Sequence, residues 1–160
     1  MGTSCLNKMS KITKIQVVCF ANYCRSPVAE KLLQSLTSEN INVTSAGISP
    51  MVTSTMDKRS KKFLEDEGYN AELFVPQEIT STMIMESKLT LALDFKVFKT
   101  LIDNYGRRQS IKMFNFLEPS TLIPDPYNYN SEDYLLVMKD IKRLCMMVSE
   151  YINNNLEELD

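Results

Sequence analysis

One stretch near the start of the chain specifies its architecture: Ile15-Gln-Val-Val-Cys-Phe-Ala-Asn-Tyr-Cys-Arg-Ser-Pro-Val-Ala29. Its opening residues, Ile15 to Phe20, form a short β-branched run that is typical of a strand. Ser26-Pro27 then indicates the start of a helix, with proline at the first helical position. Apolar residues recur beyond it at helical spacing, at Val28, Ala29, Leu32, Leu33 and Leu36. The stretch therefore predicts a strand, a loop and a helix in direct succession.

The rest of the chain repeats this alternation. Strands are predicted at residues 41–48, 88–94 and 111–117. Helices are predicted at residues 57–67, 95–105 and about 131–154. Such an alternation favours right-handed crossovers and a parallel sheet covered on both faces. We therefore expect a flavodoxin-like three-layer sandwich with a four-stranded parallel sheet, built by one domain over residues 13–160 after a flexible tail over residues 1–12.

The composition narrows the classes of function. The chain has 160 residues, of which 44% are hydrophobic and 24% charged, and its net charge is −2. This balance indicates neither a nucleic-acid partner nor binding to anionic lipid. No apolar run approaches the ~20 residues that cross a bilayer, and the N-terminus lacks the apolar stretch of a secretory signal. We therefore expect a cytoplasmic protein without a membrane partner.

The chain has four cysteines and no histidine, which restricts the chemistry further. Without export signals the cysteines do not indicate a disulfide framework. Only Cys19 and Cys24 form a close pair in the sequence, so no zinc site is predicted, and we expect neither a metal nor another cofactor. The absence of histidine removes every Ser–His and Cys–His pair, so an activated cysteine here needs another source of activation.

The segment from Cys19 to Ser26 supplies such a source, because it reads cysteine, five residues, arginine and serine between a strand and a helix. Ligands of parallel sheets bind at the carboxyl ends of the strands, and the backbone N–H groups of a short turn can point at one anion. The helix N-terminus adds a positive field that favours the thiolate of Cys19, and Ser26 can donate to its sulfur. Arg25 offers a planar fork to two phosphate oxygens. The alternative is a buried strand cysteine beside a surface arginine, but the pattern and its context favour a phosphate-binding loop that includes Phe20, Ala21, Asn22, Tyr23 and Cys24.

Val18 to Glu30 resembles the signature loop of the low-molecular-weight protein tyrosine phosphatase family. Other segments resemble the family in the same order along the chain: Ser45-Ala46-Gly47, Asp57-x-Arg59, Ile79-Thr80, the strand that ends at Asp94, and Asp125-Pro126-Tyr127. The resemblance extends from about Lys14 to the C-terminus.

The resemblance implies a phosphatase that hydrolyses phosphotyrosine proteins or small aryl phosphates through a phosphocysteine and releases inorganic phosphate. Cys19 would be the nucleophile, Arg25 the phosphate clamp and Asp125 the general acid. Prolines on both sides restrict the backbone of Asp125, which suits a carboxyl group that must meet a leaving oxygen, although without the resemblance an ordinary turn would be the better interpretation. The resemblance further implies loop-bracing hydrogen bonds from Asn22, Ser26 and Ser45, and a substrate slot with Tyr127 and Met51.

Cys24 is implied by the resemblance to trap oxidised Cys19 as a disulfide, a role that is compatible with packing. Four positions depart from the family pattern. Ala21 stands where the family usually has glycine, and a positive φ there would add strain of about 1 kcal/mol or more. Met51 replaces an aromatic residue, Phe74 a bracing histidine and Asn128 a second tyrosine, so we expect low activity or an unusual substrate.

Two alternatives remain open. An arsenate reductase of the same fold passes oxidation to two later cysteines, but this chain has none between Cys24 and Cys145. A phosphate-binding or phosphoprotein-binding module with a weakened loop would not need the full set of Cys19, Arg25 and Asp125. The sequence therefore favours the phosphatase.

Overall fold

The computed structural model describes residues 11–155, so all but the end of the tail predicted over residues 1–12 lies outside the described residues. The elements are β1 (Thr13–Cys19), α2 (Ser26–Leu36), β2 (Ile41–Gly47), α3 (Lys58–Asp66), α4 (Ser81–Glu86), β3 (Leu89–Ala92), α5 (Phe95–Tyr105), β4 (Ile111–Met113) and α6 (Ser131–Asn154). The single domain over residues 13–160 stays a prediction.

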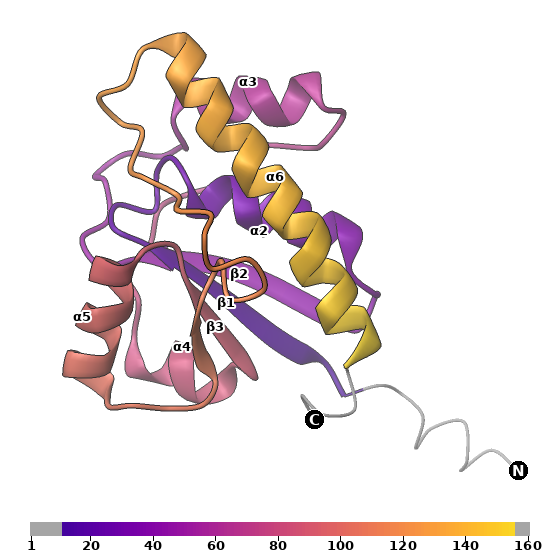
Figure 1. Cartoon of the computed structure of the whole chain (residues 1–160), viewed down its shortest axis with the longest axis vertical. Helices are drawn as coiled ribbons and strands as arrows, with labels where there is room; N and C mark the ends of the chain where they lie inside the picture. The colour runs from indigo at the N-terminus through magenta and orange to yellow at the C-terminus, as the bar shows by residue number, and fades with distance from the viewer. Residues whose placement is uncertain (1–10, 156–160) are drawn as a thin grey trace, which may run out of the picture.

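The four strands form one parallel sheet, as predicted. Their order in the sheet is β2-β1-β3-β4. In β1, Val17 belongs to a core that includes α2 and α6, whereas Val18 belongs to a core that includes α5. Successive strand residues point to opposite faces, so the sheet is buried on both sides. Figure 1 shows α2, α3 and α6 on one side of the sheet and α4 and α5 on the other. The three-layer sandwich is thereby confirmed.

Local details differ from the predictions. The helix α4 was missed, because a six-residue segment with a Thr80 cap gives too short a pattern for helical periodicity. The strand predicted over residues 111–117 ends at Met113, because the chain turns there and Phe116 N–H donates to the Met113 carbonyl at 3.0 Å. In α2 the first helical residue is Ser26, and Pro27 follows at the second position.

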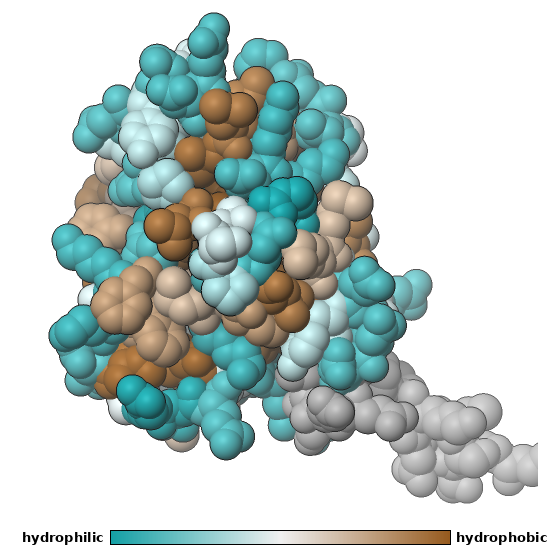
Figure 2. Space-filling view, viewed as in Figure 1, coloured by the Kyte–Doolittle hydropathy of each residue, from teal (hydrophilic) through white to brown (hydrophobic). Residues whose placement is uncertain are grey.

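The outer surface of α6 carries both hydrophobic and hydrophilic side chains (Figure 2). Figure 2 shows hydrophobic side chains toward its N-terminal half, where Leu135 and Leu136 are exposed, among hydrophilic neighbours. Within residues 11–155, no helix combines the length and the apolar character needed to cross a membrane.

The carboxyl end of β2 approaches the loop after β1 so closely that only glycine fits. Cys19 pairs with Gly47 at the last position of the parallel ladder. A Cβ atom on Gly47 would lie 2.8 Å from the Phe20 carbonyl oxygen and 2.9 Å from the Asn22 nitrogen. Both atoms belong to the backbone, which cannot move aside as a flexible side chain could. The Ser45-Ala46-Gly47 segment therefore fixes where the loop lies.

We expect Gly47→Ala to lower the free energy of unfolding by about 1–3 kcal/mol, because an added methyl group must displace the loop backbone. Chemical denaturation measures the loss, and amide chemical shifts of Phe20 and Asn22 report the displacement. Gly68→Ala is the control: Gly68 has φ +86° and open space around its Cβ position, so alanine there adds only local backbone strain. Unchanged stability and unchanged loop shifts in Gly47→Ala would contradict the close approach.

Candidate active site

The loop after β1 is held with its carbonyl groups pointing outward. Those of Cys19, Phe20, Ala21, Tyr23 and Cys24 accept hydrogen bonds from the N–H groups of Ile48, Ser49, Met51 and Asp57 and from the Ser60 hydroxyl, at 2.7–3.1 Å. The described chain has no cis peptide bond. Because the N–H group of a trans peptide points away from its carbonyl, the next residues' N–H groups face the inside of the loop. There they join the N-terminus of α2 in one cradle suited to an anion.

The positive φ in this loop lies at Asn22, at +50°, and not at Ala21. Asparagine tolerates this left-handed region better than most residues. The strain that a positive φ at Ala21 would have caused is therefore absent, and alanine is compatible with a well-formed loop.

A chain of hydrogen bonds orients the sulfur of Cys19. Its Sγ lies 2.9 Å from the Ser26 Oγ and accepts from the Asn22 N–H at 3.2 Å. The Asn22 side-chain amide donates to the Ser26 Oγ at 2.7 Å and to the Ser45 Oγ at 3.0 Å. Since Ser26 accepts from Asn22, its own hydroxyl hydrogen is available to the sulfur. This arrangement suits a thiolate, which accepts hydrogen bonds.

Further residues fix the orientation of Asn22 and Ser45. The Ser45 hydroxyl donates to the Glu30 carboxylate at 2.9 Å. Burial raises the pKa of Glu30, although the hydrogen bond from Ser45 opposes this shift. The Gln77 N–H donates to the Asn22 Oδ1 at 2.9 Å, and the Gln77 side chain donates to the Ser45 carbonyl at 2.9 Å. Phe74, in the place of a bracing histidine, packs in the core instead. Gln77 supplies the brace.

Arg25 is buried rather than exposed, with 2% of its surface accessible. Its Nη1 donates to the Asp94 Oδ2 and to the Ile123 carbonyl, both at 2.8 Å. Asp94 follows β3 and also caps α5 by accepting from the Val97 N–H. These contacts bring the loop after β1, the end of β3 and the approach to Asp125 together around one guanidinium group.

A cavity of about 340 Å³ opens above the cradle. It is lined by Cys19, Phe20, Ala21, Tyr23, Cys24, Arg25, Met51, Asp125, Tyr127 and Asn128. The rings of Tyr23 and Tyr127 meet edge to face with centroids 6.3 Å apart. The predicted nucleophile, clamp, acid and slot residues therefore line the same cavity, whereas Asn22, Ser26 and Ser45 lie behind its wall.

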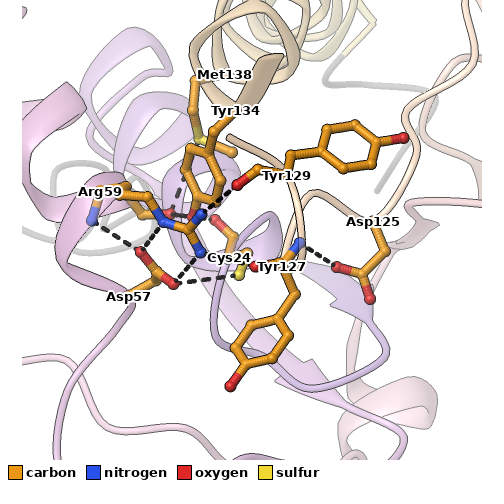
Figure 3. Close-up of polar contacts among 9 residues, drawn as sticks. Cys24, Asp57, Arg59, Asp125, Tyr127, Tyr129, Tyr134 and Met138 are labelled. Atoms are coloured by element: carbon orange, nitrogen blue, oxygen red, sulfur yellow. Dashed lines mark hydrogen bonds and ion pairs between the residues drawn. The ribbon is translucent and has the colours of Figure 1, made fainter. Parts of the chain in front are cut away.

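Asp125 is exposed on the rim of this cavity. The Tyr127 N–H donates to its Oδ1 at 3.1 Å, which closes a tight turn around the buried Pro126. Figure 3 shows the carboxylate beside Tyr127, with Arg59 reaching the following backbone from the other side. The carboxyl group can thus meet a group entering the cavity without being buried itself.

Cys24 lines the cavity and also contacts the residue that caps α3. Its thiol lies 3.8 Å from the Asp57 Oδ2. Burial and the negative charge of Asp57 raise the pKa of Cys24 to about 12, although Tyr134 opposes this shift. The Cys24 thiol is therefore neutral at physiological pH.

Five residues of the site were given no role from the sequence. They are Asp94, Gln77, Glu30, Gly47 and Arg59, and each acts through a contact with another segment of the chain. Asp94 had a usable signal, since an acidic residue at the carboxyl end of a buried strand lies at the edge where parallel sheets bind ligands. Gln77 had none, because it lies in a segment without regular structure.

Comparison with known proteins agrees with this geometry. The family model described as low molecular weight phosphotyrosine protein phosphatase matches residues 14–158. The low molecular weight protein-tyrosine-phosphatase Etp of Escherichia coli is 29% identical over 126 residues, which cover 78% of this chain and 84% of Etp.

Solved structures of similar proteins share the fold. Vibrio vulnificus Wzb in complex with benzylphosphonate is 25% identical with a TM-score of 0.80, covering 88% of this chain and 99% of Wzb. The Erwinia amylovora tyrosine phosphatase AmsI is 25% identical with a TM-score of 0.77, covering 86% of this chain and 91% of AmsI. Since the family model spans nearly the whole chain and the fold and cavity agree with it, the chain belongs to the low molecular weight phosphotyrosine protein phosphatase family.

Proposed function

We propose that this phosphatase hydrolyses phosphotyrosine through Cys19 as nucleophile, Arg25 as phosphate clamp and Asp125 as general acid. One observation carries the proposal: the sulfur of Cys19 lies in a cradle of backbone N–H groups on a cavity that Arg25 and Asp125 also line. The benzylphosphonate complex of the Vibrio protein supports a slot for an aryl group next to a phosphate. Small aryl phosphates are the simplest substrates of this kind.

The reaction follows in two steps. The thiolate of Cys19 attacks phosphorus, and the bond from phosphorus to the aryl oxygen breaks while Asp125 gives its proton to that oxygen. Arg25 and the loop N–H groups hold the three remaining phosphate oxygens as charge develops on them. Water then attacks the phosphocysteine and loses a proton to Asp125. The sulfur–phosphorus bond breaks, and inorganic phosphate leaves.

The positions of the aromatic residues support an aryl substrate. Tyr127 and Tyr23 provide apolar walls, and Met51 and Phe20 complete the mouth. Met51 in place of an aromatic residue leaves one wall flexible. This feature supports a broader choice of aryl phosphates as substrates. That the substrate is a phosphotyrosine protein, and that this phosphatase is cytoplasmic, stay predictions.

The arsenate reductase alternative has little support. The described cysteines are Cys19, Cys24 and Cys145, and Cys145 is fully buried on α6. A relay of oxidation through it would require the helix to move. The binding-module alternative depended on a loop weakened by Ala21, and that residue does not have a positive φ.

We expect Cys19→Ser to abolish hydrolysis of 4-nitrophenyl phosphate while the protein stays folded. A serine hydroxyl remains protonated where a thiol ionises, so the cradle cannot make it a nucleophile. The assay is run with a chelator present, and circular dichroism checks the fold. Near-normal turnover in Cys19→Ser would reject Cys19 as nucleophile.

We expect Asp125→Asn to slow turnover of phenyl phosphate by roughly 10²–10⁴-fold, the range for a lost general acid. The loss should be smaller for 4-nitrophenyl phosphate, because its leaving group needs less protonation. The measurement is kcat/KM for a series of aryl phosphates with increasing leaving-group pKa, in both proteins. Equal dependence on the leaving group in the two series would show that Asp125 is only a loop residue.

Cys24 is proposed to protect the nucleophile from irreversible oxidation. Peroxide converts the Cys19 thiolate to a sulfenic acid, and the Cys24 thiol then displaces water to form a disulfide that thiol reductants reopen. We expect Cys24→Ala to recover less activity than the wild type after peroxide and reductant, with peptide mapping to locate the disulfide. Cys145→Ala is the matched control, since Cys145 is fully buried on α6 and does not line the cavity that holds Cys19 and Cys24. Equal recovery in Cys24→Ala and wild type would remove the protective role.

A further inference from the structure

The loop that carries Asp125 is held after that residue by a side chain from another element. Arg59, in the first turn of α3, donates from Nη2 to the Tyr127 carbonyl and from Nη1 to the Tyr129 carbonyl, both at 3.0 Å. Before Asp125, the same loop is held by Arg25 through the Ile123 carbonyl. Two arginines from different elements therefore fix the two ends of the acid-bearing segment.

The contact with Tyr127 matters because Tyr127 orients the acid. The hydrogen bond that the Asp125 carboxylate accepts comes from the Tyr127 N–H, at 3.1 Å. Asp125 is exposed, so packing does little to fix its side chain. The position of the Tyr127 backbone therefore sets the position of the carboxylate, and Arg59 holds that backbone (Figure 3).

Arg59 is itself held on three sides. Its Nε donates to the Asp57 Oδ1 at 3.0 Å and its Nη2 to the Asp57 Oδ2 at 2.9 Å. Its guanidinium carbon lies 4.0 Å from the centre of the Tyr134 ring, a distance suited to a cation–π contact. Burial alone would raise the pKa of Asp57, but the hydrogen bonds from Arg59 hold it below the usual range. The Arg59 guanidinium group is therefore held in one orientation by Asp57, by the Tyr134 ring and by the two carbonyl groups of the acid loop.

The same Asp57 is tied to the loop of the nucleophile. Its N–H donates to the Tyr23 carbonyl at 3.0 Å, and its carboxylate is the partner of the Cys24 thiol. Ser60 follows Arg59 in the chain, and its hydroxyl donates to the Cys24 carbonyl at 2.7 Å. The start of α3 thus contacts the nucleophile loop and the acid loop at once, so it sets the distance between them.

We propose that Arg59 is a positioning residue for Asp125, which it holds over the Cys19 cradle through the carbonyls of Tyr127 and Tyr129. The proposal rests on the role of Asp125 as general acid. Lysine could not replace Arg59, since a single ammonium group cannot reach a carboxylate and two carbonyls in the geometry of a planar fork.

The test measures kcat/KM of Arg59→Gln with phenyl phosphate and 4-nitrophenyl phosphate, alone and combined with Asp125→Asn. Misplacing a catalytic group by about 1 Å can cost on the order of 10²-fold, so we expect a loss of about 10–100-fold with phenyl phosphate. With 4-nitrophenyl phosphate we expect a loss of about threefold or less, because its leaving group depends less on the acid. In the Asp125→Asn background the added loss should be below about threefold with both esters, since coupled residues are not additive.

Further measurements separate positioning from a general structural role. The inhibition constant of inorganic phosphate should stay within about twofold of wild type, because the Cys19 cradle does not need Arg59 to bind an anion. Arg59→Lys keeps the charge but should still show most of the loss of kcat/KM with phenyl phosphate. If Arg59→Gln fails to fold, Arg59→Lys takes its place in the test. Lys62→Gln is the matched control, because Lys62 lies on the same helix and its Nζ pairs with the exposed Asp66 at 2.7 Å. It should leave every constant unchanged.

Several results would overturn the proposal. Equal losses with both esters, full additivity with Asp125→Asn, or a parallel weakening of phosphate inhibition would each show that Arg59 acts on the cradle or the fold and not on the acid. Wild-type rates in Arg59→Lys would show that charge alone suffices. An unchanged leaving-group dependence in Asp125→Asn by itself would instead reject the acid assignment, which separates failure of the proposed function from failure of this inference.

Discussion

The guanidinium group of Arg25 is buried, and a buried cation is tolerated only where charged and polar partners surround it. Here the partners are the Asp94 carboxylate and the Ile123 carbonyl. Each comes from a different segment, so satisfying one charge requires the end of β3 and the loop toward Asp125 to lie beside the start of α2. The parallel sheet makes this possible, because its strands all deliver their carboxyl ends to one edge. Much of the architecture around the cavity follows from pairing this one group.

In the loop around Cys19, the hydrogen bonds of the backbone carbonyl groups determine which way the N–H groups point. Its carbonyls are occupied by the chain after β2 and by the start of α3, so its N–H groups remain directed inward. Gly47 allows the two backbones to approach closely enough for this exchange of hydrogen bonds. An anion site made in this way needs no histidine and only one basic side chain, which is consistent with a chain of net charge −2.

Interactions between the site's parts run through α3 as well as through the sheet. Asp57 caps α3, accepts from Arg59, and donates through its N–H to the nucleophile loop. The thiol of Cys24 lies at the same junction, where burial keeps its pKa high. Asp57 therefore links Arg59, which holds the acid loop, to the loop that carries Cys19.

The sequence by itself determined the alternation of strands and helices, the parallel sheet, and the loop from Cys19 to Ser26, because periodicity, proline and a compact motif are local signals. It also named Asp125 through family resemblance. Only the tertiary structure decided that Asn22 and not Ala21 has the positive φ, that Asp94 pairs with Arg25, and that Gln77 braces the loop in place of a histidine. The last two features are hydrogen bonds between residues 55 or more positions apart. Such contacts leave no periodic trace in the sequence, since their partners meet only when the strand ends assemble at one edge of the sheet.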